Sequence, residues 1–181
     1  MGINIAIDGP AGAGKSTIAK KVAKELSFIY VDTGAMYRAM AFYLLEKGIS
    51  GDEKIAEACH GADISIRYEN GEQQVILNGK NVTAFLRKEE VGNMASVSSA
   101  NPEVRSHLLK LQRNLAVENN VVMDGRDIGT TILPNAEVKI FLTASARTRA
   151  NRRYLELTEK GEACDLEAIL KDIIDRDERD M

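Results

Sequence analysis

Residues 3–17, INIAIDGPAGAGKST, decide the fold of this chain. They open with a short apolar run, residues 3–7, that is typical of a buried strand. The pattern G-x-x-x-x-G-K-S then begins at Gly9 and ends at Ser16, and apolar residues recur at helical spacing from Ile18 to Leu26. Strand, glycine-rich turn and helix in this order predict a loop that binds the phosphates of a nucleotide.

Each residue type in this loop suits phosphate. The glycines allow backbone dihedral angles closed to other residues, so that several N–H groups can converge on one phosphate, and the next helix adds its positive end. Lys15 contributes a full charge, and the Ser16 hydroxyl can bind Mg²⁺. The alternative is a glycine turn whose lysine merely opens a surface helix, but the flanking strand and helix favour the phosphate loop. We expect a nucleoside triphosphate to contact Gly9, Pro10, Ala11, Gly12, Ala13, Gly14, Lys15, Ser16 and Thr17.

Length and composition set broad limits on the class of protein. A chain of 181 residues, 44% of them hydrophobic, suits one domain with a full core. A net charge of −3 argues against general nucleic-acid binding, and two distant cysteines with two histidines indicate neither a zinc site nor a disulfide framework. No apolar stretch is long enough to span a membrane, and the chain enters a strand without a signal sequence, so we expect a cytoplasmic protein.

Beyond the loop, strand and helix signals alternate as in a parallel sheet covered by helices. Further strands are predicted at 28–31, 121–123 and 138–142. Helices are predicted after Arg38 with Gly48 as C-cap, over 88–99, from Pro102, from Ala146 to Gly161, and from Asp165 onward. The predicted fold class is α/β, with three layers: a central parallel sheet and helices on both faces.

Residues 62–82 follow a different pattern. Apolar and polar residues alternate there, and Asn70-Gly71 and Asn78-Gly79 interrupt the alternation. Asn-Gly between alternating runs is a strong hairpin signal, so we predict a small antiparallel three-stranded sheet inserted into the α/β unit. The insert is either a decorative surface sheet or a lid over a second substrate, and its position alone favours neither.

Polar residues follow several of the predicted strands and should meet at the carboxyl edge of the sheet, where ligands bind in this fold class. Asp124 closes an apolar strand and is placed to hold Mg²⁺ together with Ser16. Its alternative role is to cap a turn or helix. Asp8 competes more weakly for the metal role.

Arginines are the other candidates for phosphate chemistry. Arg149, Arg152 and Arg153 share one face of a predicted helix and suit the charge on a transferring phosphoryl group. The alternative is a solvated face on which Glu156 pairs with them. Arg38, Arg105 and Arg126 are further candidates on the same reasoning. The sequence lacks the N-K-x-D segment of a GTPase, so a small-molecule or nucleotide kinase fits best.

Several segments together resemble the bacterial cytidylate kinase family over residues 3–180. They are Gly9–Lys15, D-T-G-A-M-Y-R at 32–38, the Asn-Gly meander, Gln112-Arg113, D-G-R-D-I-G-T at 124–130, and Arg176-Asp177. The resemblance implies a P-loop NTPase fold of the nucleoside monophosphate kinase type. It also implies transfer of the γ-phosphoryl group of ATP to CMP or dCMP with Mg²⁺, by a protein we expect to be a monomer.

The resemblance also implies roles for individual residues. Thr33, Arg38, Arg126 and Arg176 match positions that grip the acceptor nucleotide, mostly its phosphate. Ser96, Arg105 and Asp127 match positions that read the cytosine edge, and Asp180 with Arg176 matches the sugar-contacting pair. The three helical arginines fall in the lid of this family. The expected catalytic residues are therefore Lys15, Arg126, Arg149, Arg152 and Arg153.

The resemblance divides the single domain into a core at 1–34 and 102–145, a monophosphate-binding part at about 35–101, and a lid at about 146–165. The family continues past residue 180 with a further strand and helix, so we expect the chain to be the ordered portion of a longer protein. Two other hypotheses stay open: a P-loop kinase for a small metabolite, and a nucleotide-binding module without catalysis.

Overall fold

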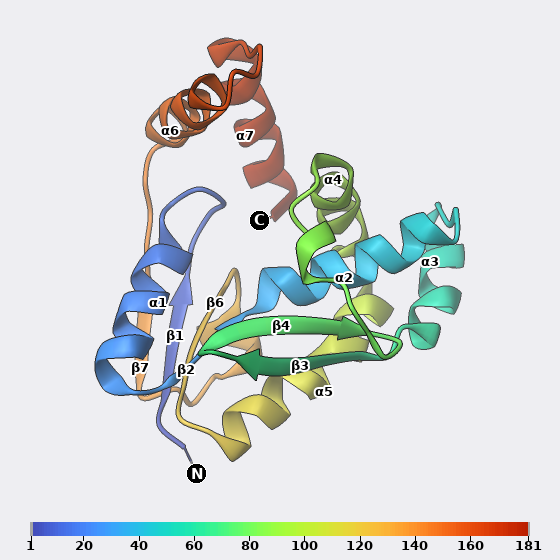
Figure 1. The fold of residues 1–181 in the computed structure, drawn as a ribbon, viewed down its shortest axis with the longest axis vertical. Coiled ribbons are helices and arrows are strands. Elements are labelled where there is room, and N and C mark those ends of the chain that lie inside the picture. Colours follow the sequence, from blue (N-terminus) through green and yellow to red (C-terminus); the bar gives the residue numbers. More distant parts are fainter. Residues whose placement is uncertain (1, 181) are drawn as a thin grey trace.

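A four-stranded parallel sheet forms the centre of the computed structural model, which describes residues 2–180, and their side chains as far as Glu178. Its strands are β1 (Asn4–Asp8), β2 (Ile29–Asp32), β6 (Val121–Gly125) and β7 (Val138–Phe141), in the order β2-β6-β1-β7 (Figure 1). All three neighbouring pairs are parallel. The predicted α/β class and its parallel sheet are confirmed.

Helices cover both faces of this sheet because side chains alternate along each strand. In β1, Ile5 and Ile7 pack with α1 (Lys15–Leu26) through Ala19 and Ala23. Ala6, between them, joins the larger core on the opposite face. That core also holds side chains from α2 (Thr33–Glu46) and α5 (Pro102–Glu118).

The insert is a separate three-stranded antiparallel sheet, as predicted. Its strands are β3 (Ile64–Glu69), β4 (Glu72–Leu77) and the short β5 (Lys80–Asn81). Both Asn-Gly turns have positive φ at the two central residues, 53° and 79° in the first and 47° and 78° in the second. That is the geometry of a type I′ turn, and it explains why asparagine and glycine stand there.

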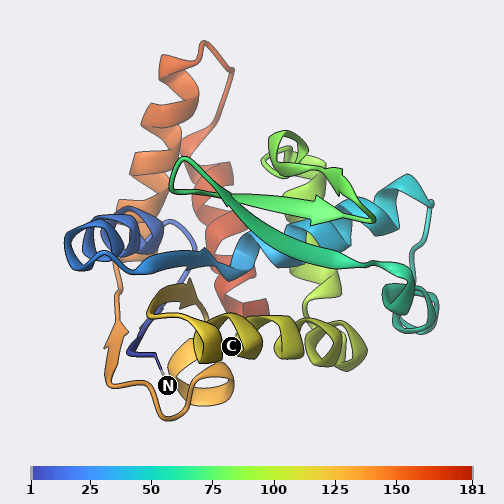
Figure 2. The same ribbon diagram turned by 60° about the horizontal axis from the view of Figure 1, so that its bottom comes forward.

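The insert is attached to the rest of the molecule in two ways. It lies alongside α2 (Figure 2), and Val75 and Leu77 of β4 belong to the same apolar core as α2. Along β2, the contacts are polar. The Gln73 side chain accepts a hydrogen bond from Asp32 N–H (2.9 Å) and donates one to Asp32 C=O (3.1 Å). The Tyr68 hydroxyl donates to Tyr30 C=O (3.1 Å). These bonds occupy backbone groups that β2 exposes as an edge strand of the central sheet.

Helix boundaries follow local signals. Asn101 caps α5 by accepting from the N–H groups of Glu103 and Val104, and Asp165 accepts from Ala168 N–H where α7 (Leu166–Asp180) begins. Between β2 and β3 the structure adds α3 (Asp52–Ala58) and the 3-10 turn η1 (Cys59–Gly61), which the sequence did not predict. The turn η2 (Thr83–Phe85) and α4 (Glu89–Ser98) follow the insert.

One boundary differs from the sequence prediction. Helix α2 begins at Thr33, immediately after β2, so that the D-T-G-A-M-Y-R segment forms its first turns rather than a loop before it. The Asp32 carboxylate makes this possible because it accepts a hydrogen bond from Ala35 N–H (3.0 Å) and caps the helix.

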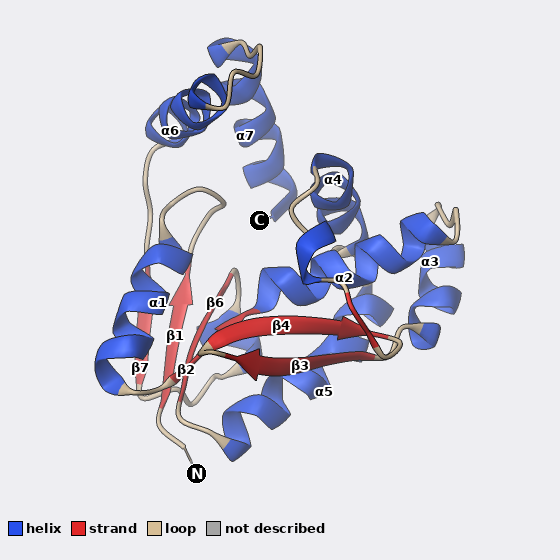
Figure 3. Ribbon diagram, viewed as in Figure 1, coloured by secondary structure: helices blue, strands red, loops and turns tan. Residues whose placement is uncertain are grey.

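The last two helices stand apart from the sheet. Helices α6 (Ala146–Glu159) and α7 pack on each other beyond the carboxyl ends of the strands, at the top of Figure 1, and α7 returns to contact α4. Strand β7, the other edge of the central sheet, exposes Val138, Ile140 and Phe141. Colouring by secondary structure shows the strands of the insert running across those of the central sheet (Figure 3). In the part of the chain that is described, none of the helices has the length and apolar character needed to cross a membrane.

Candidate active site

The loop between β1 and α1 has the backbone that the sequence predicted. Gly9, Gly12 and Gly14 have φ values of 142°, 74° and 98°, which side-chain-bearing residues rarely adopt. Gly9 also has no room for a larger residue, because a Cβ there would lie 1.9 Å from the carbonyl oxygen of Leu142. The loop is therefore held against the residue that follows β7, and its N–H groups and the start of α1 face the carboxyl edge of the sheet.

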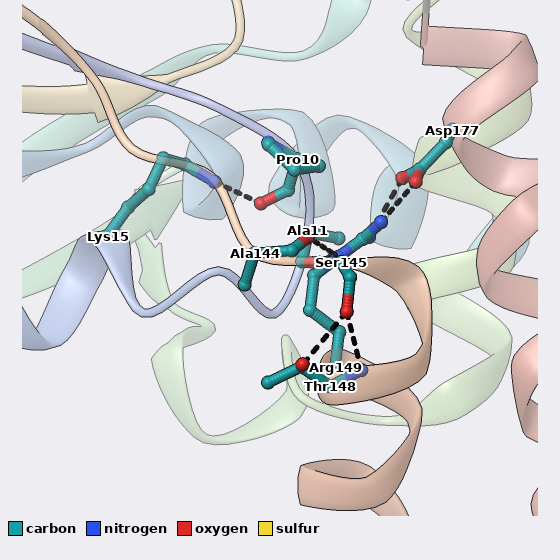
Figure 4. Close-up of polar contacts among 8 residues, drawn as sticks. All are labelled: Pro10, Ala11, Lys15, Ala144, Ser145, Thr148, Arg149 and Asp177. Atoms are coloured by element: carbon teal, nitrogen blue, oxygen red, sulfur yellow. Dashed lines mark hydrogen bonds and ion pairs between the residues drawn. The ribbon is translucent and has the colours of Figure 1, made fainter.

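Lys15 is the charged group inside this loop. Its side chain is buried, with 6% of its surface exposed, and its Nζ donates to Pro10 C=O (2.9 Å; Figure 4). Burial and, to a smaller extent, the charge on Arg126 lower the pKa of Lys15 to about 8, against the opposing effects of Asp124 and Asp8. The lysine thus has too little negative charge around it, as expected for a group that pairs with phosphates.

Asp124, at the end of β6, lies next to the loop. One carboxylate oxygen accepts from the Ser16 hydroxyl (2.9 Å) and the other from the Tyr30 hydroxyl (2.9 Å). Burial raises the pKa of Asp124, and the charge on Asp32 raises it further, while the hydrogen bonds from Ser16 and Tyr30 and the charge on Lys15 lower it. The side chain therefore bonds two hydroxyl groups rather than capping a helix, and a nearby cation would stabilise its charged form.

These residues fit Mg²⁺. The ion prefers oxygen ligands and usually keeps several waters beside one or two protein groups and substrate phosphates. The Ser16 hydroxyl and one Asp124 oxygen are in hydrogen-bond contact, so one small cation can reach both. Among the described residues there is no cluster of three His, Cys, Asp or Glu that would form a site independent of a nucleotide.

Asp8 has a different position from the one proposed for a metal ligand. Its two oxygens accept hydrogen bonds from the N–H groups of Ile128 (2.7 Å) and Gly129 (2.8 Å). These residues begin the π-helical segment η3 (Ile128–Ile132). At the other end of η3, the Arg113 side chain donates hydrogen bonds to the carbonyls of Thr131 and Ile132. Asp8 thus fixes the segment that follows Arg126 and Asp127.

The residues assigned to the acceptor nucleotide come from four helices, α2, α4, α5 and α7, and from the segment between β6 and η3. Arg105 of α5 forms an ion pair and hydrogen bond with Asp127, so two of the three base-reading candidates are together. The third, Ser96 of α4, has a buried hydroxyl with no hydrogen bond to the described residues. Burial raises the pKa of Tyr37, which also senses the charges of Arg105 and Asp127 and therefore lies near this pair.

The remaining acceptor candidates lie closer to the loop. The Thr33 hydroxyl is buried and donates to Asp124 C=O (2.7 Å), which joins α2 to β6. Arg126 and Arg176 both influence the pKa of Lys15, so they lie near it. Arg38 approaches Gly34, one turn earlier on α2. The side chain of Asp180 lies outside those that the structure describes.

The three arginines of α6 differ from one another, and Figure 4 shows the contacts of the first, Arg149. Arg149 is buried, and its guanidinium binds both carboxylate oxygens of Asp177 while donating to Ala11 C=O (3.1 Å) and Ala144 C=O (2.9 Å). Arg152 reaches the loop carbonyls of Gly12 and Ala13, each at 3.4 Å. Arg153 pairs with Glu156 on the exposed side (3.2 Å), as in the solvated-face alternative.

Sequence reasoning missed Tyr30 as a member of the site, gave Asp177 no role of its own, and considered Asp8 only as a metal ligand rather than as the partner of η3. Asp8 and Tyr30 belong to apolar strands, where one polar residue is the only signal, and their partners are more than ninety residues away. Asp177 stands beside Arg176 in a charged helix, and nothing local distinguishes it from the other acids there.

Comparison with known proteins gives one consistent result. A family model described as cytidylate kinase matches residues 5–181. A protein of Caldicellulosiruptor bescii named cytidylate kinase is 52% identical over 99% of this chain and 80% of its own length. Proteins of the same name from Listeria innocua and Bacillus cytotoxicus are 51% and 48% identical over 98% of this chain and 80% of theirs.

Proposed function

Because the chain belongs to the cytidylate kinase family, we propose which of its residues carry the reaction of that family. It is an ATP-dependent nucleoside monophosphate kinase that transfers the γ-phosphoryl group of ATP to CMP or dCMP, giving ADP and CDP or dCDP. One observation supports the assignment of roles best. The Lys15 loop lies beside the segment that carries Arg126 and Asp127, at one edge of the sheet.

On the donor side, residues 9–17 bind the ATP phosphates. The loop N–H groups and the start of α1 supply partial positive charge, and Lys15 supplies a full one. Its bond to Pro10 C=O is exchanged for phosphate oxygen when ATP binds. Ser16 and Asp124 would hold Mg²⁺, directly or through water, and the bound ion would supply charge neutralisation to the phosphates.

On the acceptor side, Asp127, Arg105 and Ser96 read the base. Cytosine offers an amino donor at N4 and acceptors on its ring, so a carboxylate beside a guanidinium complements its polar edge. Their mutual ion pair keeps both groups oriented before the base arrives. Thr33, Arg38, Arg126 and Arg176 position the acceptor phosphate, and Asp180 with Arg176 holds the sugar.

The arrangement needs little proton chemistry. Phosphoryl transfer depends mainly on position and on the neutralisation of charge spread over the equatorial oxygens, which Lys15 and Arg126 provide. Asp127 is assigned to binding, since it is already paired with Arg105. Arg149 and Arg152 of α6 donate hydrogen bonds to carbonyls of the phosphate loop. Closure of α6 and α7 brings the lid arginines over the phosphates and excludes water.

An acceptor panel tests this function. CMP, dCMP, UMP, TMP and AMP are each supplied with Mg-ATP, and ADP release is followed. We expect kcat/KM for CMP and dCMP to exceed that for the others by about 10²-fold or more, because the Asp127–Arg105 pair complements the amino donor of cytosine, uracil and thymine present a carbonyl there, and adenine is a larger base. Preference for UMP, TMP or AMP contradicts the proposal, and turnover of none of them favours a small-metabolite kinase.

Binding of ATP should take up protons near pH 8–9. Without nucleotide, Lys15 loses its proton as the pH rises through about 8. The phosphates stabilise the charged form and raise this pKa, so nucleotide binding must protonate Lys15 in that window. Calorimetric titration with ATP in buffers of different ionisation enthalpy measures this uptake. It should fade below pH 7, and a Lys15→Met protein should show none; equal uptake by both proteins contradicts the assignment.

We further assign the protein to the cytoplasm, where ATP is available and Cys59 and Cys164 remain reduced thiols. We also propose a monomer as the active form. The division into core, monophosphate-binding part and lid also belongs to this proposal: Arg38 and Ser96 lie in the monophosphate-binding part, on α2 and α4, while α6 carries the lid arginines.

A further inference from the structure

Tyr30 occupies a position that the roles above leave unexplained. It lies in β2, its ring lines the cleft between α1 and the insert, and its hydroxyl is turned inward. There it donates to Asp124 Oδ1 (2.9 Å), while Asp124 Oδ2 accepts from the Ser16 hydroxyl (2.9 Å). The carboxylate is thus held at both oxygens, by the loop on one side and by β2 on the other.

From this geometry we propose that Tyr30 is a positioning residue for the metal. It fixes the Asp124 carboxylate so that Oδ2 faces Ser16, and it acts on Mg²⁺ only through Asp124. The inference rests on the proposed role of Ser16 and Asp124 in holding Mg²⁺.

The carboxylate needs such a restraint. The terminal torsion of an aspartate has a broad energy profile, so hydrogen bonds decide the orientation of its oxygens. Asp32 lies directly opposite Asp124 in the β2–β6 pairing and repels it. Without the bond to Tyr30, only Ser16 would orient the group, and Ser16 must turn its own oxygen to the same cation.

Tyr30 is itself well fixed. Its backbone pairs with Val122 of β6, two residues before Asp124. Its carbonyl accepts from the Tyr68 hydroxyl (3.1 Å), and Lys20 Nζ lies 5.5 Å from its ring centre. The hydroxyl is therefore presented to Asp124 by a rigid strand, which is what a supporting group for a metal ligand requires.

Tyr30→Phe removes one oxygen and leaves the ring in place. We expect the free Mg²⁺ concentration for half-maximal rate to rise about 10-fold, the size typical of groups that support a metal ligand. Equilibrium binding of Mn²⁺ to the enzyme–ADP complex, followed by electron paramagnetic resonance, should weaken by the same factor. The Kd of CMP should stay within about twofold, which also shows that the variant is folded.

Tyr68→Phe is the matched control. It removes a neighbouring phenol hydroxyl that contacts Tyr30 but not Asp124, so both metal readouts should stay within about twofold of the wild type. Equal metal effects in the two variants, or an equal loss of CMP and metal binding in Tyr30→Phe, overturn the inference.

A double-mutant cycle separates this inference from the proposed function. Asp124→Asn should weaken Mn²⁺ binding strongly, and Tyr30→Phe should then add nothing, because its effect passes through the missing carboxylate. If Asp124→Asn leaves metal binding unchanged, the proposed metal role of Asp124 fails. If Asp124→Asn weakens Mn²⁺ binding but Tyr30→Phe does not, only the role of Tyr30 fails. The same holds if the losses of Mn²⁺ binding caused by the two substitutions add independently.

Discussion

Lys15→Met is expected to lower kcat by about 10³-fold and at the same time to make the protein more stable at neutral pH. The rate falls because the variant loses the full positive charge next to the transferring phosphoryl group, and loss of one such group typically costs factors of this size. Steady-state rates with saturating ATP and CMP measure it. If ATP binding weakens but the wild type has no turnover to lose, the chain is a nucleotide-binding module.

The gain in stability follows from the sign of the pKa shift. The pKa of Lys15 is lowered from 10.5 to about 8 on folding, so the folded state binds its proton less tightly than the unfolded state. The resulting penalty is complete below pH 8 and disappears as the pH rises beyond the unfolded pKa. A shift of this size corresponds to about 1–3 kcal/mol, after allowance for the lost bond to Pro10.

Urea unfolding at pH 7 and at pH 10.5 checks this expectation. The free energy of unfolding of Lys15→Met should exceed that of the wild type at pH 7, and the difference should shrink at the higher pH. Lys21→Met, an exposed lysine on the same helix, is the control and should change neither rate nor stability appreciably. A variant that is less stable at pH 7 would show that Lys15 is satisfied in the empty loop.

Asp127→Ala is expected to lower kcat/KM for CMP by about 10²–10³-fold, the cost of truncating one partner of a hydrogen-bonded charge pair. The cytosine amino group loses its acceptor, and Arg105 is left without its carboxylate. Because UMP presents an acceptor where CMP presents a donor, the preference for CMP over UMP should collapse. The KM for ATP should stay within about twofold.

The acceptor panel applied to this variant provides the measurement. Glu90→Ala, which breaks the exposed pair with Lys88 at the start of α4, serves as the control and should leave the panel unchanged. Unaltered acceptor choice in Asp127→Ala would point to a kinase for another metabolite. A parallel rise in the KM for ATP would mean that Asp127 supports the whole edge of the sheet rather than the base.

Local signals account for what the sequence could predict. The phosphate loop, the Asn-Gly turns and the cap at Asn101 depend on residues within a few positions of one another, so their structure can be read directly. The proximity of the loop to Asp124 could also be predicted, because both follow neighbouring parallel strands and the carboxyl ends of such strands lie at the same edge of the sheet. Helix α3 was missed because only Ile55 of its seven residues is buried, which leaves no apolar stripe.

The rest of the site depends on side chains that meet across the fold. Nothing near Arg149 shows that it is buried on Asp177 rather than exposed beside Arg153. Likewise, nothing near Asp8 in the sequence shows that its two oxygens accept hydrogen bonds from the first N–H groups of η3. In each case the partner lies far away in the chain, so sequence spacing carries no information about the contact.

The two attachments of the insert have unequal consequences for motion. Along α2 the contact is apolar, and opening it would expose Val75 and Leu77 to water. Along β2 it consists of the three hydrogen bonds from Gln73 and Tyr68, which water can replace. At about 1 kcal/mol net for each bond, detachment from β2 costs roughly 3 kcal/mol, so that about 1% of molecules have this seam open at any moment. We therefore expect the insert to move together with α2 and to separate first along its hydrogen bonds with β2.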